Sequence, residues 1–164
     1  MTRLAIDTDY LHNRLVKLLE VPSPTGYTDT IARECCGELE RLGIPYELTR
    51  RGAIRAKFPG LRAKPARAII AHLDTLGAQV KSLKPNGRLG IVPIGNWSSR
   101  FAEGARCTIF SEKGSYRGTI LPLLASGHTF NEAVDTQPTG WDHVEVRVDT
   151  LARNASDLRQ AGID

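Results

Sequence analysis

Apolar residues in the first quarter of the chain recur three or four positions apart, as on one face of an α-helix. The pattern predicts one helix over residues 9–20, begun by an N-cap within residues 7–9, and a second over residues 29–42. Gly43 supplies a left-handed stop, and the prolines of residues 22–24 cannot continue a helix because they lack an amide hydrogen. The apolar positions are Leu11, Leu15, Leu18 and Leu19 in the first helix, and Ile31, Cys35, Leu39 and Leu42 in the second.

Three short strands are predicted to follow, over residues 46–49, 54–58 and 67–71. In the third, Ala68-Ile69-Ile70-Ala71 is continuously apolar, which is typical of a central strand covered on both faces. Helices followed by such a strand indicate an α/β layer architecture.

The pattern changes after Gly77 to short alternating segments separated by turns. Strands are predicted over residues 79–83 and 89–94 around Pro85-Asn86-Gly87, and over 107–111 and 116–121 around Lys113-Gly114. A further strand is predicted over 144–148 and a helix over 155–161. Five short strands with tight turns favour a small barrel or sandwich, so we expect one domain over residues 1–76 and a β-rich domain over 77–164.

Composition narrows the class of protein. The 164 residues carry 22 Lys and Arg against 18 Asp and Glu, with three cysteines, two of them adjacent at Cys35 and Cys36. Such cysteines form no closed disulfide framework, which favours a reduced, cytoplasmic setting, and no apolar run reaches the ~20 residues of a membrane span. Residues 41–67 are strongly basic, but basic and apolar residues alternate over 54–58 as in a half-buried strand. We therefore expect neither a nucleic-acid nor a membrane partner.

The sharpest chemical feature is Ala71-His72-Leu73-Asp74, which ends the apolar strand. Ligands bind α/β sheets outside the carboxyl ends of the strands, and a neutral imidazole there is a natural zinc or cobalt ligand. An acid two residues later projects to the same side, where it can orient the ring. The alternative is a histidine that caps the strand by hydrogen bonding.

The order of these motifs resembles a known family. A Pro-Ser-x-x-Gly turn at residues 22–26 follows the first helix, and an Ala-His-x-Asp strand end follows at 71–74. Directly afterwards the sequence changes to the short alternating segments of the β-rich part. In this order the chain resembles the dinuclear metallo-aminopeptidases of the glutamyl and deblocking aminopeptidase family, also labelled cellulase-like endoglucanases. Residues 96–101 and 125–131 resemble the branch found with the loci for the osmoprotectant N-acetylglutaminylglutamine amide.

The resemblance implies the N-terminal part of a three-layer metallopeptidase domain, followed by a small β-barrel-like inserted domain. It implies His72 as the first metal ligand, Asp74 as the catalytic acid behind it, and two divalent metal ions, zinc or cobalt. It also implies a peptide substrate and a homo-oligomer. The family's other ligands have no counterpart here, so we expect an inactive N-terminal fragment, in which the strand at 68–71 lacks neighbours and exposes apolar surface. The alternative is a non-catalytic binding or oligomerisation module.

Overall fold

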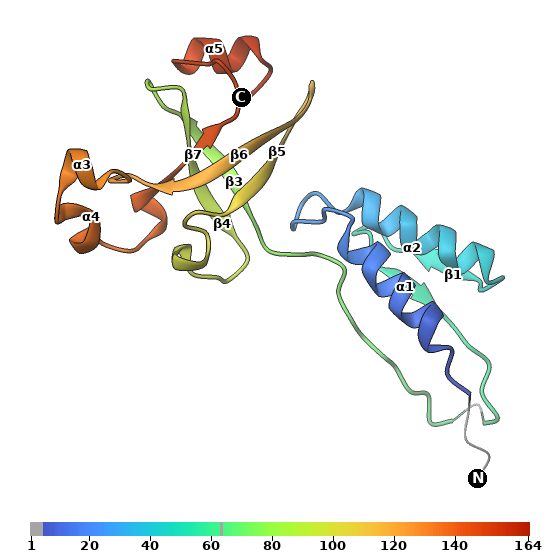
Figure 1. The fold of residues 1–164 in the computed structure, drawn as a ribbon. Coiled ribbons are helices and arrows are strands. Elements are labelled where there is room, and N and C mark those ends of the chain that lie inside the picture. Colours follow the sequence, from blue (N-terminus) through green and yellow to red (C-terminus); the bar gives the residue numbers. More distant parts are fainter. Residues whose placement is uncertain (1–4, 63) are drawn as a thin grey trace. The chain divides into compact units, whose positions relative to one another are not determined.

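The computed structural model describes residues 5–62 and 64–164, and the chain divides into two compact units, Met1–Thr75 and Leu76–Asp164. Each unit is described by itself (Figure 1). Within the described part of the chain, every helix is too short or too polar to cross a bilayer.

The first unit begins with two helices, α1 (Thr8–Leu19) and α2 (Asp29–Arg41), as the sequence predicts. Asp7 caps α1 by accepting a hydrogen bond from the Tyr10 amide, and Gly43 follows α2 with a φ of 67°. Arg14 of α1 lies 3.1 Å from Glu34 and 3.3 Å from Glu38 of α2. Ion pairs therefore join two helices that bury little apolar surface.

The strands of this unit are short. β1 (Tyr46–Leu48) and β2 (Ile54–Ala56) form an antiparallel pair, and β2 ends two residues earlier than predicted. Among the described residues of this unit, Ile31 is the one fully buried apolar side chain, at 1% exposed, while Leu11, Leu15 and Leu19 of α1 are more than half exposed.

The prediction of a strand over residues 67–71 is wrong for this chain, whereas the expected exposure of apolar surface there is confirmed. The segment forms no strand, and the side chains of Ile69 and Ile70 are 101% and 90% exposed. The physical reason is the absence of a neighbour, since β1 and β2 pair only with each other among the described residues. The segment is apolar as the sequence indicates, but nothing in the described chain covers either of its faces.

The second unit is a curled antiparallel sheet of five strands in the order β3-β4-β7-β6-β5. Both predicted hairpins and the predicted last strand are confirmed. The turn between β3 and β4 places Gly87 at a φ of 75°, a conformation that glycine adopts at low cost. The strands are β3 (Gly77–Leu83), β4 (Arg88–Ile94), β5 (Arg106–Ser111), β6 (Gly114–Pro122) and β7 (Val144–Val148).

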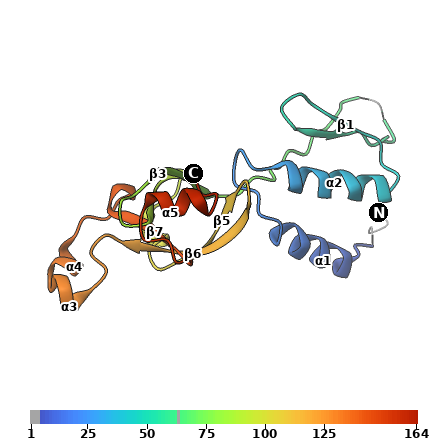
Figure 2. The ribbon, with the colours of Figure 1, turned by 90° about the horizontal axis from the view of Figure 1, so that it is seen from above.

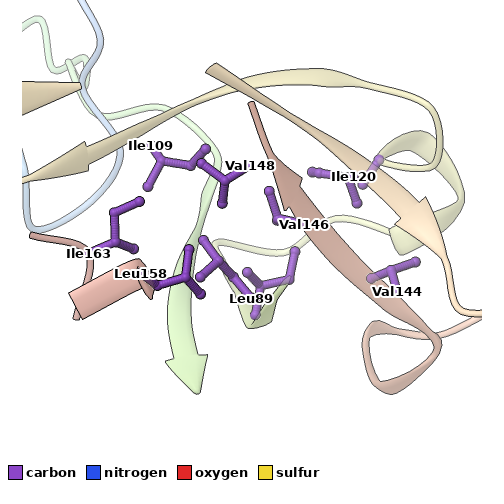
Figure 3. Packing of buried hydrophobic residues seen from close by; sticks show 10 residues of the cluster. Leu89, Ile109, Ile120, Val144, Val146, Val148, Leu158 and Ile163 are labelled. Carbon is purple, nitrogen blue, oxygen red and sulfur yellow. The ribbon is translucent and has the colours of Figure 1, made fainter. Parts of the chain in front are cut away.

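The core lies between one face of this sheet and the last helix, α5 (Ala155–Gln160), as Figure 3 shows. Leu158 of α5 and Leu89 of β4 are both 0% exposed, and Ile163 closes the cluster at 1%. Tyr116 donates a hydrogen bond from its hydroxyl to the Ala161 carbonyl and ties β6 to the end of α5. This unit therefore has a core of its own.

Short helices occupy the connections of the second unit (Figure 2). Between β4 and β5, Trp97 packs edge-on against Trp141, with ring centroids 4.6 Å apart, and donates to the Gly77 carbonyl at 3.0 Å. The short helices are η1 (Ser99–Phe101), α3 (Gly127–Phe130), α4 (Ala133–Thr136) and η2 (Trp141–His143).

Substitution of Gly118 by Ala should destabilise the second unit by about 1–3 kcal/mol, because β6 packs tightly there. A Cβ at this position would lie 2.7 Å from Ile109 Cδ1 and 2.9 Å from the Arg147 carbonyl oxygen. Urea unfolding followed by tryptophan fluorescence measures this, since both tryptophans belong to this unit. Gly127→Ala is the control, because its added methyl meets no atom within 4 Å, and an equal loss in both variants would contradict the prediction.

Substitution of Ile69 by Ala should change the free energy of unfolding by less than about 0.5 kcal/mol, because the side chain is exposed. Ile31→Ala removes the same atoms from a buried site and should cost about 2–5 kcal/mol. Chemical denaturation followed by far-UV circular dichroism compares the two variants. Equal losses would show that the segment at 67–71 is buried in solution.

Substitution of Glu145 by Gln should lower the free energy of unfolding at neutral pH by about 1–3 kcal/mol. The side chain is 6% exposed and lies 2.7 Å from Lys84 Nζ and 2.5 Å from an Arg88 nitrogen. Burial raises its pKa, but the hydrogen bonds from Lys84 and Arg88 outweigh burial and hold the pKa below its ordinary value of 4.5. The stabilisation is therefore present above about pH 4.5 and is lost as the pH falls through the folded pKa.

Urea titrations at a series of pH values should show that the difference in free energy of unfolding between the parent chain and Glu145→Gln disappears in acid. Glu132→Gln is the control, because this exposed carboxylate has no cation within ion-pair distance among the described residues. A free-energy difference for Glu145→Gln that is the same at every pH would contradict the conclusion that the ionised carboxylate stabilises this unit.

Candidate functional site

The Pro-Ser-x-x-Gly turn lies directly against the segment that carries His72 and Asp74. Ser23 is 1% exposed, and its hydroxyl donates to the Leu73 carbonyl at 2.8 Å. The Thr75 amide donates to the Ser23 carbonyl at 2.8 Å, and Pro24 and Thr75 form a parallel bridge. The prolines on both sides of Ser23 exclude helix there, so its backbone is extended and available for this pairing.

Thr25 holds the Asp74 side chain. Its hydroxyl donates to Asp74 Oδ2 at 2.7 Å. This hydrogen bond is the largest cause that lowers the pKa of Asp74, and the aspartate's own backbone amide and the nearby His72 lower it further against a smaller effect of burial. Asp74 is therefore ionised at neutral pH.

The imidazole of His72 is oriented by Asp74. Nδ1 lies 2.9 Å from the Asp74 carbonyl oxygen and 3.2 Å from Asp74 Oδ1. Both oxygens are acceptors in the ionised residue, so Nδ1 carries the proton and donates, which leaves the lone pair on Nε2. The side chain is 82% exposed, and Nε2 is thus available to a ligand from outside this segment.

This arrangement fits one metal–ligand bond. Histidines that bind metals typically donate their other ring nitrogen to a carboxylate or a carbonyl, and His72 does both. The described residues contain no group of three or more His, Cys, Asp and Glu side chains that could hold a metal ion. For the two metal ions expected from the sequence, the described residues therefore provide one oriented ligand, the imidazole of His72.

The structure brings together both residues that the sequence singles out and adds two that it does not. His72 and Asp74 are hydrogen-bonded to each other. Ser23 holds the backbone between them at Leu73, and Thr25 holds the side chain of Asp74. A signal for both was present in the sequence, because Ser23 lies between two prolines and Thr25 directly follows the second, where the backbone lacks amide donors. The roles of His72 as a metal ligand and of Asp74 as a catalytic acid stay predictions.

Residues 52–164 match the family model of the M42 glutamyl aminopeptidases. The protein named "Putative aminopeptidase YhfE" of Bacillus subtilis (strain 168) is 32% identical over 148 residues, which cover 90% of this chain and 42% of that protein. The lysyl aminopeptidase of Pyrococcus furiosus is 27% identical over 86% of this chain and 40% of its own length. The chain therefore spans less than half the length of these relatives.

Solved structures show the same fold. A TET aminopeptidase from a marine sediment Thaumarchaeota archaeon superposes with a TM-score of 0.79 at 18% identity, over 97% of this chain and 43% of that one. The TET1 peptidase of Pyrococcus horikoshii, described as assembling into a tetrahedron or a large octahedral shell, gives 0.72 at 18% identity, over 92% of this chain and 43% of its own. Likeness at this identity concerns the mixed α/β fold alone. Because the family model covers more than half of the sequence, this chain belongs to the M42 glutamyl aminopeptidase family.

Proposed function

We propose that this chain supplies part of the active site of a metal-dependent aminopeptidase, with His72 as a metal ligand. The observation that carries the proposal is the His72 ring, whose Nδ1 is fixed by two Asp74 oxygens while the rest of the ring faces solvent. Family membership supports the reaction class, hydrolysis of N-terminal peptide bonds of a peptide substrate.

Each residue has a distinct task in this proposal. His72 binds through Nε2, Asp74 keeps the proton on Nδ1, and its negative charge makes Nε2 a stronger donor to a cation. Thr25 keeps Asp74 ionised and in place. Two divalent ions, zinc or cobalt, would supply Lewis-acid polarisation of the scissile carbonyl.

The remaining ligands are proposed to come from sequence outside this chain. One imidazole does not hold two metal ions, which need several protein ligands between them. In this proposal residues 1–76 are the N-terminal portion of the peptidase domain and residues 77–164 are an inserted domain. The 164-residue chain is expected to be inactive alone. We place the complete protein in the cytoplasm and in the osmoprotectant-associated branch.

We also propose that the protein forms a homo-oligomer. Two proteins of similar structure are described as a dodecamer and as a tetrahedral or octahedral assembly. A second candidate function, a non-catalytic oligomerisation module, is favoured by one observation. The second unit has its own buried core, so it can serve as an assembly module whether or not the first unit is part of an active enzyme.

The proposed function is tested in a chimera of residues 1–164 joined to the remaining C-terminal part of the Bacillus subtilis relative. Hydrolysis of a panel of aminoacyl p-nitroanilides should be measurable, and chelation should abolish it. His72→Ala should reduce kcat/KM at least about 100-fold because a ligand is lost, and Thr25→Val should weaken metal affinity about 10- to 100-fold.

His12→Ala is the matched control, because it removes an exposed imidazole from α1. The unmodified relative gives the reference rate, and residues 1–164 alone should show none. An active chimera that keeps its activity after His72→Ala would overturn the assignment of His72. Activity of the 164-residue chain by itself would overturn the proposal that its ligand set is incomplete.

A further inference from the structure

The face of the five-stranded sheet opposite the core is rich in arginine. Strand register places Arg88 opposite Arg147, Arg147 opposite Thr119, and Thr119 opposite Arg106, so one row crosses four strands. Arg117 lies opposite Thr108 in the next row. We call this surface the arginine face; its cations are Lys84, Arg88, Arg106, Arg117 and Arg147.

The carboxylates on this face are too few to balance its cations. Glu145 is shared by Lys84 and Arg88. Asp149 pairs closely with Arg106 and lies 3.9 Å from an Arg147 nitrogen.

Arg117 is exposed, donates to the Thr108 hydroxyl and lies beyond ion-pair distance of the carboxylates among the described residues, although its charge helps to lower the pKa of Asp149. The side chain of Arg147 is 57% exposed. Two carboxylates thus serve five cations, and the two least neutralised cations face solvent.

The same unit carries an acidic projection. Residues 118–146 contain no Lys or Arg, and within them residues 126–138, here called the acidic arm, form α3 and α4. Glu132 and Asp135 of the arm are exposed and form no ion pair with the part of the chain that the structure describes. Gln137 braces the arm, because its side-chain amide donates to the Leu124 and Val134 carbonyls at 2.9 and 3.0 Å.

The arm does not reach the arginine face of its own copy. The connection that carries the arm leaves the sheet after the last residue of β6 and returns at the first residue of β7, as Figures 1 and 2 show. Arg117 lies near the start of β6 and Arg147 near the end of β7, both toward the opposite ends of their strands. At about 3.3 Å per residue, five residues of β6 separate Arg117 from the base of the arm by roughly 17 Å.

We infer that the acidic arm of one copy of this chain binds the arginine face of a second copy. The charges identify the partner. The arginine face has surplus cations and the acidic arm has unpaired carboxylates, and the two cannot meet within one molecule, so a second copy of the chain supplies the complementary surface. The inference deepens the self-association proposed above and does not depend on the peptidase chemistry. Single exposed ion pairs contribute about 0.2–1 kcal/mol and are screened by salt, so the contact is weak and sensitive to ionic strength.

Sedimentation velocity of the 164-residue chain tests the inference through two reversed variants. The face variant carries Arg117→Glu and Arg147→Glu, and the arm variant carries Glu132→Lys and Asp135→Lys. At about 50 mM salt, where screening is modest, each alone should raise the self-association Kd at least about tenfold. An equimolar mixture should recover association, because the acidic arm of the face variant meets the arginine face of the arm variant.

The control carries Arg153→Glu and Arg159→Glu, which reverse two exposed cations in and beside α5, on the core side of the sheet, and it should associate like the parent chain. Thermal melts verify that each variant is folded. Reversed variants that self-associate as tightly as the parent chain, or an equimolar mixture of the two that does not recover association, overturn this inference alone. A parent chain that is monomeric at low salt overturns the self-association proposal as well, and neither result bears on His72.

Discussion

A buried serine joins the two pieces of chain on which the candidate site depends. Ser23 donates to the Leu73 carbonyl and accepts from the Thr75 amide, so one residue satisfies backbone groups on both sides of Asp74. These contacts cross about 50 residues of sequence and fix where the turn ends relative to the His72 segment. Thr25 can reach Asp74, and Asp74 can orient His72, only because this pairing is already in place.

The two units differ in how much apolar surface they bury. The second unit buries branched apolar residues between a sheet and a short helix and is complete within the chain. The first unit joins its helices by partly buried ion pairs, in which Arg14 is 18% and Glu34 25% exposed. Its apolar helix face and its apolar segment at 67–71 stay in contact with solvent.

The elements whose contacts are local were predictable from sequence. The hairpins around Gly87 and Gly114 depend on the turn and the flanking alternation. Both helices of the first unit depend on the apolar period, and α1 also on its Asp7 cap. The segment at 67–71 was predicted to be a strand because its composition is that of a buried strand, but composition does not supply the neighbours that a strand pairs with. At the site, His72 and Asp74 were identified from a short motif. Ser23 and Thr25 were missed because their partners lie far away in sequence.

The uncovered segment also has a consequence for synthesis. On a ribosome making a protein of the relatives' length, residues 66–72 would emerge well before the sequence that follows residue 164. Domains fold as units in order of their emergence, at roughly 5–20 residues per second. The sheet of the second unit, built on two local hairpins, can fold in that interval, while the side chains of Ile69 and Ile70 stay exposed to solvent. Because the second unit directly follows this exposed segment in the sequence, its early folding would keep neighbouring nascent chains apart. Two such segments would then be less able to pair with each other.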